Sequence, residues 1–140
     1  APIIHIIKET VKCLKNHDVK NAGIMATEGT IASELFQNEL SQNGIKPIVP
    51  SKKRQAMVTS LIYNNVKAGI PANMDYFREV TDELVNIGAD TIILGCTELS
   101  LIKRDEDIGP GFIDAMEVLA KRSIINCEAP LKKEYFNLIT

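Results

Sequence analysis

Two short motifs combine hydroxyl, thiol and carboxylate side chains, and each follows a short apolar run. The first is Ala26-Thr27-Glu28-Gly29-Thr30 and the second is Gly95-Cys96-Thr97-Glu98. A turn from a strand into a helix can bind an anion, because the first N–H groups of the helix lack partners and its N-terminus carries partial positive charge. Both motifs therefore predict a site for a small molecule with a carboxylate. The alternative interpretation is that Thr30 and Thr97 only cap helices.

Cys96 carries the most reactive side chain in these motifs. It follows the apolar run 91–95, so in a parallel α/β sheet it would stand at the carboxyl end of a strand, where ligands bind. Beside a helix N-terminus its thiol pKa can be lowered, which would let it act as a base or nucleophile. Glu98 would raise that pKa unless it is protonated or points elsewhere, and it can instead recognise a substrate ammonium group. The alternative is a buried structural cysteine.

The remaining reactive side chains give weaker signals. Lys67 lies at the end of a predicted helix, where a lysine usually only meets the helix dipole. Cys13 and Cys127 are expected to be inert. Three widely spaced cysteines without a Cys-x-x-Cys pair argue against a disulfide framework or a metal site, and they favour a reducing, cytoplasmic location.

The positions of the apolar residues predict helices that alternate with nearly all-apolar strands. This pattern indicates an α/β fold with three layers, in which a small parallel sheet of three to four strands is flanked by helices. We expect helices over 4–16, 30–43, 51–67, 73–87 and 114–125, strands over 21–27, 45–49 and 89–94, a weak strand near Ile108, and a charged loop over 103–107. Thr30 is the expected cap of the second helix, and Asp114-x-x-Glu117 has the form of a capping box.

Composition narrows the classes of partner. The 140 residues carry a net charge of −2, and the scattered lysines and arginines form no basic stripe, which argues against nucleic acid. No uncharged stretch approaches the length of a membrane span, so no membrane partner is expected. With 45% hydrophobic residues the chain can bury an ordinary core as one domain.

The two motifs in their context resemble the aspartate/glutamate racemase family, and most closely its aspartate racemase branch. The resembling segments are Gly23–Thr30, Ala89–Leu99 and, more weakly, Ile113-Asp114 with the helix that follows. The glutamate branch typically has histidine after the Cys-Thr pair, and this chain has Glu98 there.

The resemblance implies an amino acid racemase that needs no cofactor and no pyridoxal phosphate. In this family two cysteines face each other across the α-carbon of the substrate, and Cys96 would be the second of them. The expected substrate is a small dicarboxylic amino acid, aspartate or glutamate. Its carboxylate oxygens would be held by Thr27, Gly29, Thr30 and Thr97, and Lys67 would meet its side-chain carboxylate.

The first cysteine of the family has no counterpart in the motifs of this chain. We therefore expect residues 1–140 to form a single α/β lobe, one of two in the racemase fold, that corresponds to the second half of the family. Residues 112–140 would return to pack on the missing first lobe or on a partner chain. A homo-oligomer or an association with the N-terminal lobe is expected, and the isolated chain should be inactive.

Two alternatives remain open at this point. The first is a one-cysteine decarboxylase or isomerase of the same superfamily, which decarboxylation of a substituted malonate would favour. The second is a non-catalytic carboxylate-binding module, which tight aspartate binding with an unreactive Cys96 would favour.

Overall fold

Four short parallel strands form one sheet in the computed structural model, which describes residues 2–118, with side chains from residue 5 onward. The sheet order is β2-β1-β3-β4, and each neighbouring pair is parallel. The strands are β1 (Asn21–Met25), β2 (Lys46–Ile48), β3 (Thr91–Leu94) and β4 (Phe112–Asp114). Because parallel neighbours must be joined by crossover connections, helices fall between the strands. The predicted α/β class is confirmed.

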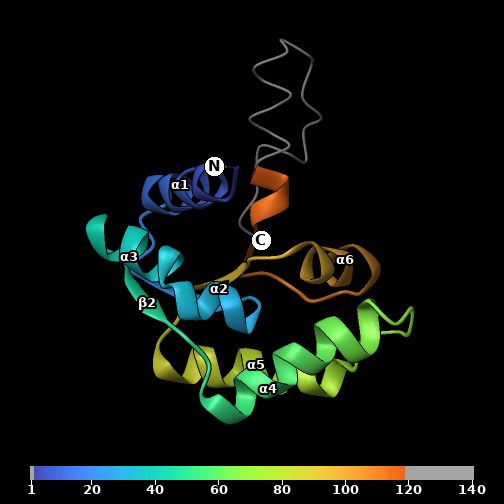
Figure 1. The fold of residues 1–140 in the computed structure, drawn as a ribbon. Helices are drawn as coiled ribbons and strands as arrows, with labels where there is room; N and C mark the ends of the chain where they lie inside the picture. The colour runs from blue at the N-terminus through green and yellow to red at the C-terminus, as the bar shows by residue number, and fades with distance from the viewer. Residues whose placement is uncertain (1, 119–140) are drawn as a thin grey trace.

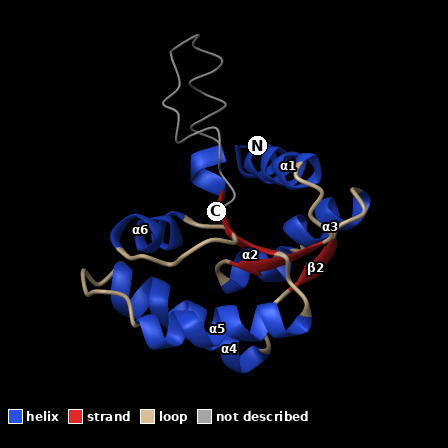
Figure 2. Cartoon of the chain, turned by 180° about the vertical axis from the view of Figure 1, so that it is seen from behind, coloured by secondary structure: helices blue, strands red, loops and turns tan. Residues whose placement is uncertain are grey.

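Helices cover both faces of the sheet and complete the three predicted layers. Figure 1 shows α1 and α3 on one side and α4 and α5 on the other, and Figure 2 shows the strands between these layers from behind. The helical elements are α1 (Pro2–Asn16), α2 (Glu28–Ser33), α3 (Leu35–Gln42), α4 (Lys52–Ser60), a π-helical segment η1 (Leu61–Val66), α5 (Met74–Ile87) and α6 (Thr97–Asp105).

The two faces of the strands have separate hydrophobic cores. Successive strand side chains point to opposite faces, so Ile24 and Ile93 pack with α1 and α3, whereas Met25 and Leu94 pack with α4, α5 and α6. All four of these side chains are fully buried. This two-sided burial explains why β1 and β3 read as continuous apolar runs rather than as alternating ones.

The helix expected to start at Thr30 starts earlier and is interrupted. Thr27 is the N-cap, because its hydroxyl oxygen accepts a hydrogen bond from the Thr30 N–H at 3.2 Å. Glu34 then adopts a left-handed conformation with φ of 58° and separates α2 from α3. The prediction of Thr30 as the cap was therefore wrong, because threonines three residues apart cannot be ranked as caps from residue type alone.

Three further predictions near the second motif need correction. The weak strand near Ile108 is instead β4, which begins at Phe112. The charged loop starts later than expected, because α6 continues to Asp105. In the Asp114-x-x-Glu117 box, Asp114 does accept from the Met116 N–H at 2.8 Å, but the Glu117 carboxylate pairs with Lys103 at 3.3 Å. The helix end near residue 125, Cys127 and the packing of 119–140 lie outside the described residues.

Candidate active site

The sheet brings the two sequence motifs together at its carboxyl edge. β1 and β3 are neighbours, and their register pairs Met25 with Leu94, the last residue of each strand. The ladder extends one step further, since the Gly95 N–H donates to the Met25 carbonyl oxygen at 2.9 Å. Ala26-Thr27 and Gly95-Cys96 therefore leave the sheet side by side.

Gly95 allows the close approach of the two strand ends. A Cβ at this position would lie 3.2 Å from the Ala26 Cβ, 3.3 Å from the Phe36 ring and 3.4 Å from the Met25 carbonyl oxygen. These neighbours are fully buried or nearly so, and backbone and ring atoms cannot easily move aside. A side chain at residue 95 would therefore push Cys96 away from the Thr27 turn.

Gly95→Ala is expected to destabilise the folded chain by about 1 to 3 kcal/mol, because it overpacks this contact. Urea unfolding followed by circular dichroism measures the change. Gly29→Ala is the matched control, since the nearest neighbour of its Cβ would be the Thr27 hydroxyl at 4.0 Å. Alanine favours a helix more than glycine does, so that control should be neutral or stabilising by up to about 1 kcal/mol. Equal losses in both variants would contradict the proposed close contact.

The first motif leaves one hydroxyl donor available. The Thr27 hydroxyl donates to the Thr30 hydroxyl oxygen at 2.9 Å while it accepts from the Thr30 N–H. The Thr30 O–H can then donate to a ligand, because its oxygen already serves as the acceptor in this pair. Gly29 lies in the first turn of α2, where helical N–H groups lack intrahelical partners.

Cys96 is the N-cap residue of α6, and its side chain makes no cap hydrogen bond. The thiol is half-buried against the core of α4, α5 and α6. Desolvation by this burial is the main cause that raises its pKa to about 11, and the Glu98 carboxylate raises it further. The nearby N–H groups of Leu99 and Glu98 and the Lys67 ammonium act in the opposite direction. The sequence left two opposing effects on this pKa open, and burial together with Glu98 outweighs the helix N-terminus.

The other predicted site residues lie on the two elements beside Cys96. Thr97 and Glu98 form the first turn of α6, with Thr97 exposed and Glu98 half-buried. Lys67 is the C-cap of η1, and its ammonium lies over the Tyr63 ring, 5.0 Å from the centroid. The charge of Lys67 lowers the pKa of the Cys96 thiol. The Lys67 charge therefore reaches the Cys96 thiol, although Lys67 is far from both motifs in the sequence.

Three polar residues that the sequence analysis did not assign to the site brace its two turns. The buried Gln55 amide donates to the Ala26 carbonyl oxygen at 3.0 Å. Ser100 donates to Asp114 at 2.6 Å and also lies 3.3 Å from the Cys96 carbonyl oxygen. Gln55 gave no signal, since it sits within a predicted helix, whereas Asp114 was noticed as a possible cap and as part of a weaker resembling segment.

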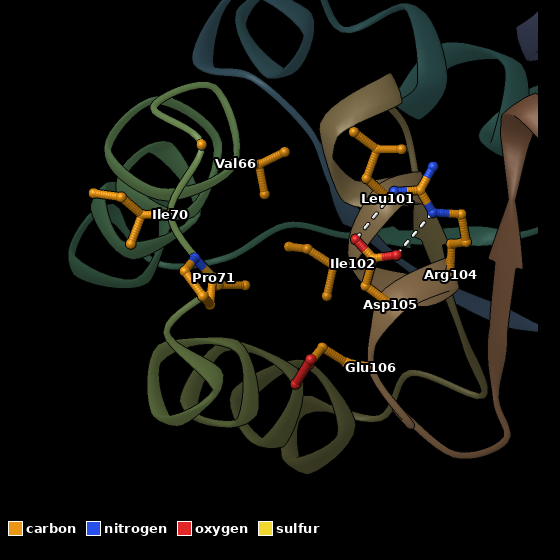
Figure 3. A pocket seen from close by; sticks show the side chains of 10 residues that line it. Val66, Ile70, Pro71, Leu101, Ile102, Arg104, Asp105 and Glu106 are labelled. Carbon is orange, nitrogen blue, oxygen red and sulfur yellow. Dashed lines mark hydrogen bonds and ion pairs between the residues drawn. The ribbon is translucent and has the colours of Figure 1, made fainter.

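The site edge is distinct from the pocket drawn in Figure 3. That pocket, of about 440 Å³, lies between the loop after η1 and the far end of α6, with the Arg104–Asp105 pair at its rim. Neither Cys96 nor Thr27 lines it. Within residues 2–118 no three His, Cys, Asp or Glu side chains cluster as metal ligands. No helix in that range is both long and apolar enough to cross a membrane.

The fold and the site together define a parallel α/β unit that presents one thiol beside the Thr27 turn at the N-terminus of α2. The family model for Asp/Glu/hydantoin racemases matches residues 1–122, and the chain belongs to this family. The resemblance that the sequence motifs indicated is thereby confirmed.

Several relatives of this chain are named as racemases. The chain is 30% identical over 129 residues to the broad specificity amino-acid racemase RacX of Bacillus subtilis, an alignment that covers 89% of this chain and 54% of that protein. It is 31% identical to an uncharacterized protein in the pnlA 3′ region of Pectobacterium carotovorum, with coverage of 89% and 84%. The structure of Picrophilus torridus aspartate racemase superposes with a TM-score of 0.71 at 28% identity, over 93% of this chain and 55% of that one. The chain thus spans about half the length of the racemases it matches.

Proposed function

We propose that this chain supplies one wall of the active site of a cofactor-independent aspartate or glutamate racemase, in which Cys96 is one of two opposed acid/base groups. The observation that carries the proposal is the position of Cys96 beside the Thr27 turn at the carboxyl edge of the sheet. Two of the three relatives named above are racemases, which favours this reaction over decarboxylation or simple carboxylate binding.

Racemisation at an α-carbon requires one group on each face of the substrate. One thiolate removes the α-proton, and a thiol on the opposite face returns a proton, so the thiolate and the thiol exchange roles between the two directions. Cys96 covers one face only. Cys13 packs on the opposite side of the sheet, against the core of α1 and α3, so it does not face Cys96. We therefore propose that the second thiol comes from another lobe of a longer protein or from a partner chain.

The raised pKa of Cys96 determines its protonation state before the reaction begins. With a pKa of about 11 the group is a neutral thiol near neutral pH, which is the form that donates a proton to the carbanion. To act as the base in the reverse direction it must ionise, which at pH 8 costs about 4 kcal/mol. The Lys67 ammonium and the helix N–H groups already act within this pKa, and without them the pKa and the cost of ionisation would be higher still. A reducing compartment such as the cytoplasm would keep the sulphur unoxidised.

The remaining contacts hold the substrate still while the proton moves. The Thr30 hydroxyl, the Gly29 N–H and Thr97 are proposed to bind the α-carboxylate, with Thr27 holding Thr30 in place. Glu98 is proposed to bind the ammonium group. Hydrogen bonds to the carboxylate also stabilise the negative charge that develops when the α-proton leaves. Lys67 is proposed to pair with the side-chain carboxylate, which would restrict the site to dicarboxylic amino acids.

Lys67→Met should therefore weaken binding of aspartate about tenfold, which is the scale of one charge-assisted hydrogen bond. Binding of alanine, which lacks the second carboxylate, should change little. Chemical-shift titration of the protein in its endogenous form measures both affinities. Lys12→Met removes an exposed lysine from α1 and should change neither. Equal weakening of aspartate and alanine binding by Lys67→Met would exclude the assigned role.

A further inference from the structure

Asp114 is a buried carboxylate that the racemase mechanism does not use. Its side chain is only 3% exposed, at the end of β4. The register pairs Asp114 with Leu94, which lies two residues before Cys96. The Asp114 carboxylate and the motif that contains Cys96 therefore lie at the same edge of the sheet. Burial of a charged group is costly unless hydrogen bonds compensate for the lost water.

The partners of Asp114 connect it to the first turn of α6. Its Oδ1 accepts hydrogen bonds from the Ser100 hydroxyl at 2.6 Å and from the Met116 N–H at 2.8 Å. The first is short, as expected for a hydroxyl that donates to a carboxylate. Because Ser100 lies four residues after Cys96, this bond ties α6 to the end of β4.

Ser100 passes the constraint on to the backbone of Cys96. Its N–H donates to the Cys96 carbonyl oxygen at 3.2 Å, and its hydroxyl lies 3.3 Å from the same oxygen. The hydroxyl proton is directed mainly at Asp114, since that distance is much shorter, and this fixes the Ser100 rotamer. The Ser100 hydroxyl thus binds the Asp114 carboxylate while the N–H of the same residue binds the Cys96 carbonyl oxygen, so Ser100 links the two.

We propose that Asp114 and Ser100 are positioning residues that fix the orientation and partial burial of Cys96. Without the bridge the first turn of α6 could separate from β4, and the thiol would gain access to water and to reagents. The inference deepens the proposed function, because it concerns the thiol to which that function assigns the chemistry. It acts through the backbone, so neither Asp114 nor Ser100 is assigned contact with the substrate.

The test follows alkylation of Cys96 by iodoacetamide in the folded protein, with the modified residue identified by peptide mass spectrometry. Ser100→Ala removes only the bridging hydroxyl and should raise the Cys96 alkylation rate at pH 8 about fivefold, the scale expected for one lost hydrogen bond. Asp114→Ala should raise it at least as much. Asp114→Asn keeps an Oδ1 acceptor for Ser100 and Met116, so it should stay within about twofold of the wild type.

Thr10→Val is the matched control for a merely structural effect. The Thr10 hydroxyl donates to the Ile6 carbonyl oxygen at 2.8 Å, four residues earlier in α1, and it is fully buried on the other side of the sheet. This variant should lose stability and leave the Cys96 rate unchanged. The proposal is overturned if Ser100→Ala, folded by circular dichroism, alkylates within twofold of the wild type. If Asp114→Ala does not fold, the Cys96 alkylation rate of Ser100→Ala alone tests the proposal. Since no readout depends on racemisation, the proposed function can fail while this inference stands, and the reverse also holds.

Discussion

Replacing Cys96 by serine should lower the racemisation rate about 10² to 10⁴-fold, the range that a positioned acid/base group contributes. Serine is nearly the same size, so the fold and the anion-binding turns should persist. Its hydroxyl ionises far less readily than a thiol, however, and it cannot take the α-proton in either direction. The rate is measured by chiral chromatography of aspartate and of glutamate, with the longest form of the protein found in its source cell.

The other two cysteines provide the controls for this variant. Cys13→Ser changes a half-buried residue of α1 on the far side of the sheet, and Cys127→Ser changes a residue to which the mechanism assigns no role. Both should retain racemisation within a few-fold of the wild type. If Cys96→Ser keeps more than about a tenth of the activity, Cys96 is not one of the two acid/base groups.

Alkylation of Cys96 should speed up about tenfold for each pH unit between pH 8 and pH 10, because the thiolate is the reactive form. The sign follows from the raised pKa of about 11: the thiol stays neutral through the range where an ordinary cysteine, with a pKa of 9.0, has already ionised. The rate should level off only near pH 11. Iodoacetamide labelling, resolved by peptide mass spectrometry, measures the profile while circular dichroism monitors the fold.

The same chain in concentrated urea is the control for this profile, since unfolding removes the desolvation that raises the pKa. There the rate of Cys96 should level off near pH 9, the ordinary value. A folded-state plateau below pH 9 would show instead that the helix N-terminus dominates over burial and Glu98.

Local residue types carried enough information to place the two motifs at the ends of strands. The apolar runs before Ala26 and before Cys96 predicted two strand ends, and the β1–β3 register brings them together. Gly95 also fits this reading, because a residue without a side chain is needed where two strand ends meet this closely. The fold class followed from the same alternation of apolar strands and helices.

Other features of the site depend on tertiary contacts and could not be predicted from the sequence. The pKa of Cys96 depends on how the core of α4, α5 and α6 desolvates the sulphur, and no local pattern encodes that packing. The Ser100–Asp114 bond joins residues 14 positions apart on separate elements. The break at Glu34 likewise comes from a left-handed backbone residue that residue type does not favour.

The most direct test of the central claim is racemisation of aspartate and glutamate by the 140-residue chain alone, measured beside its Cys96→Ser variant. Because one thiol serves only one face of the α-carbon, we expect that neither protein racemises either amino acid above the buffer rate, although both are folded. Turnover by the isolated chain that Cys96→Ser abolishes would contradict it, since a single lobe would then contain both groups that the reaction needs.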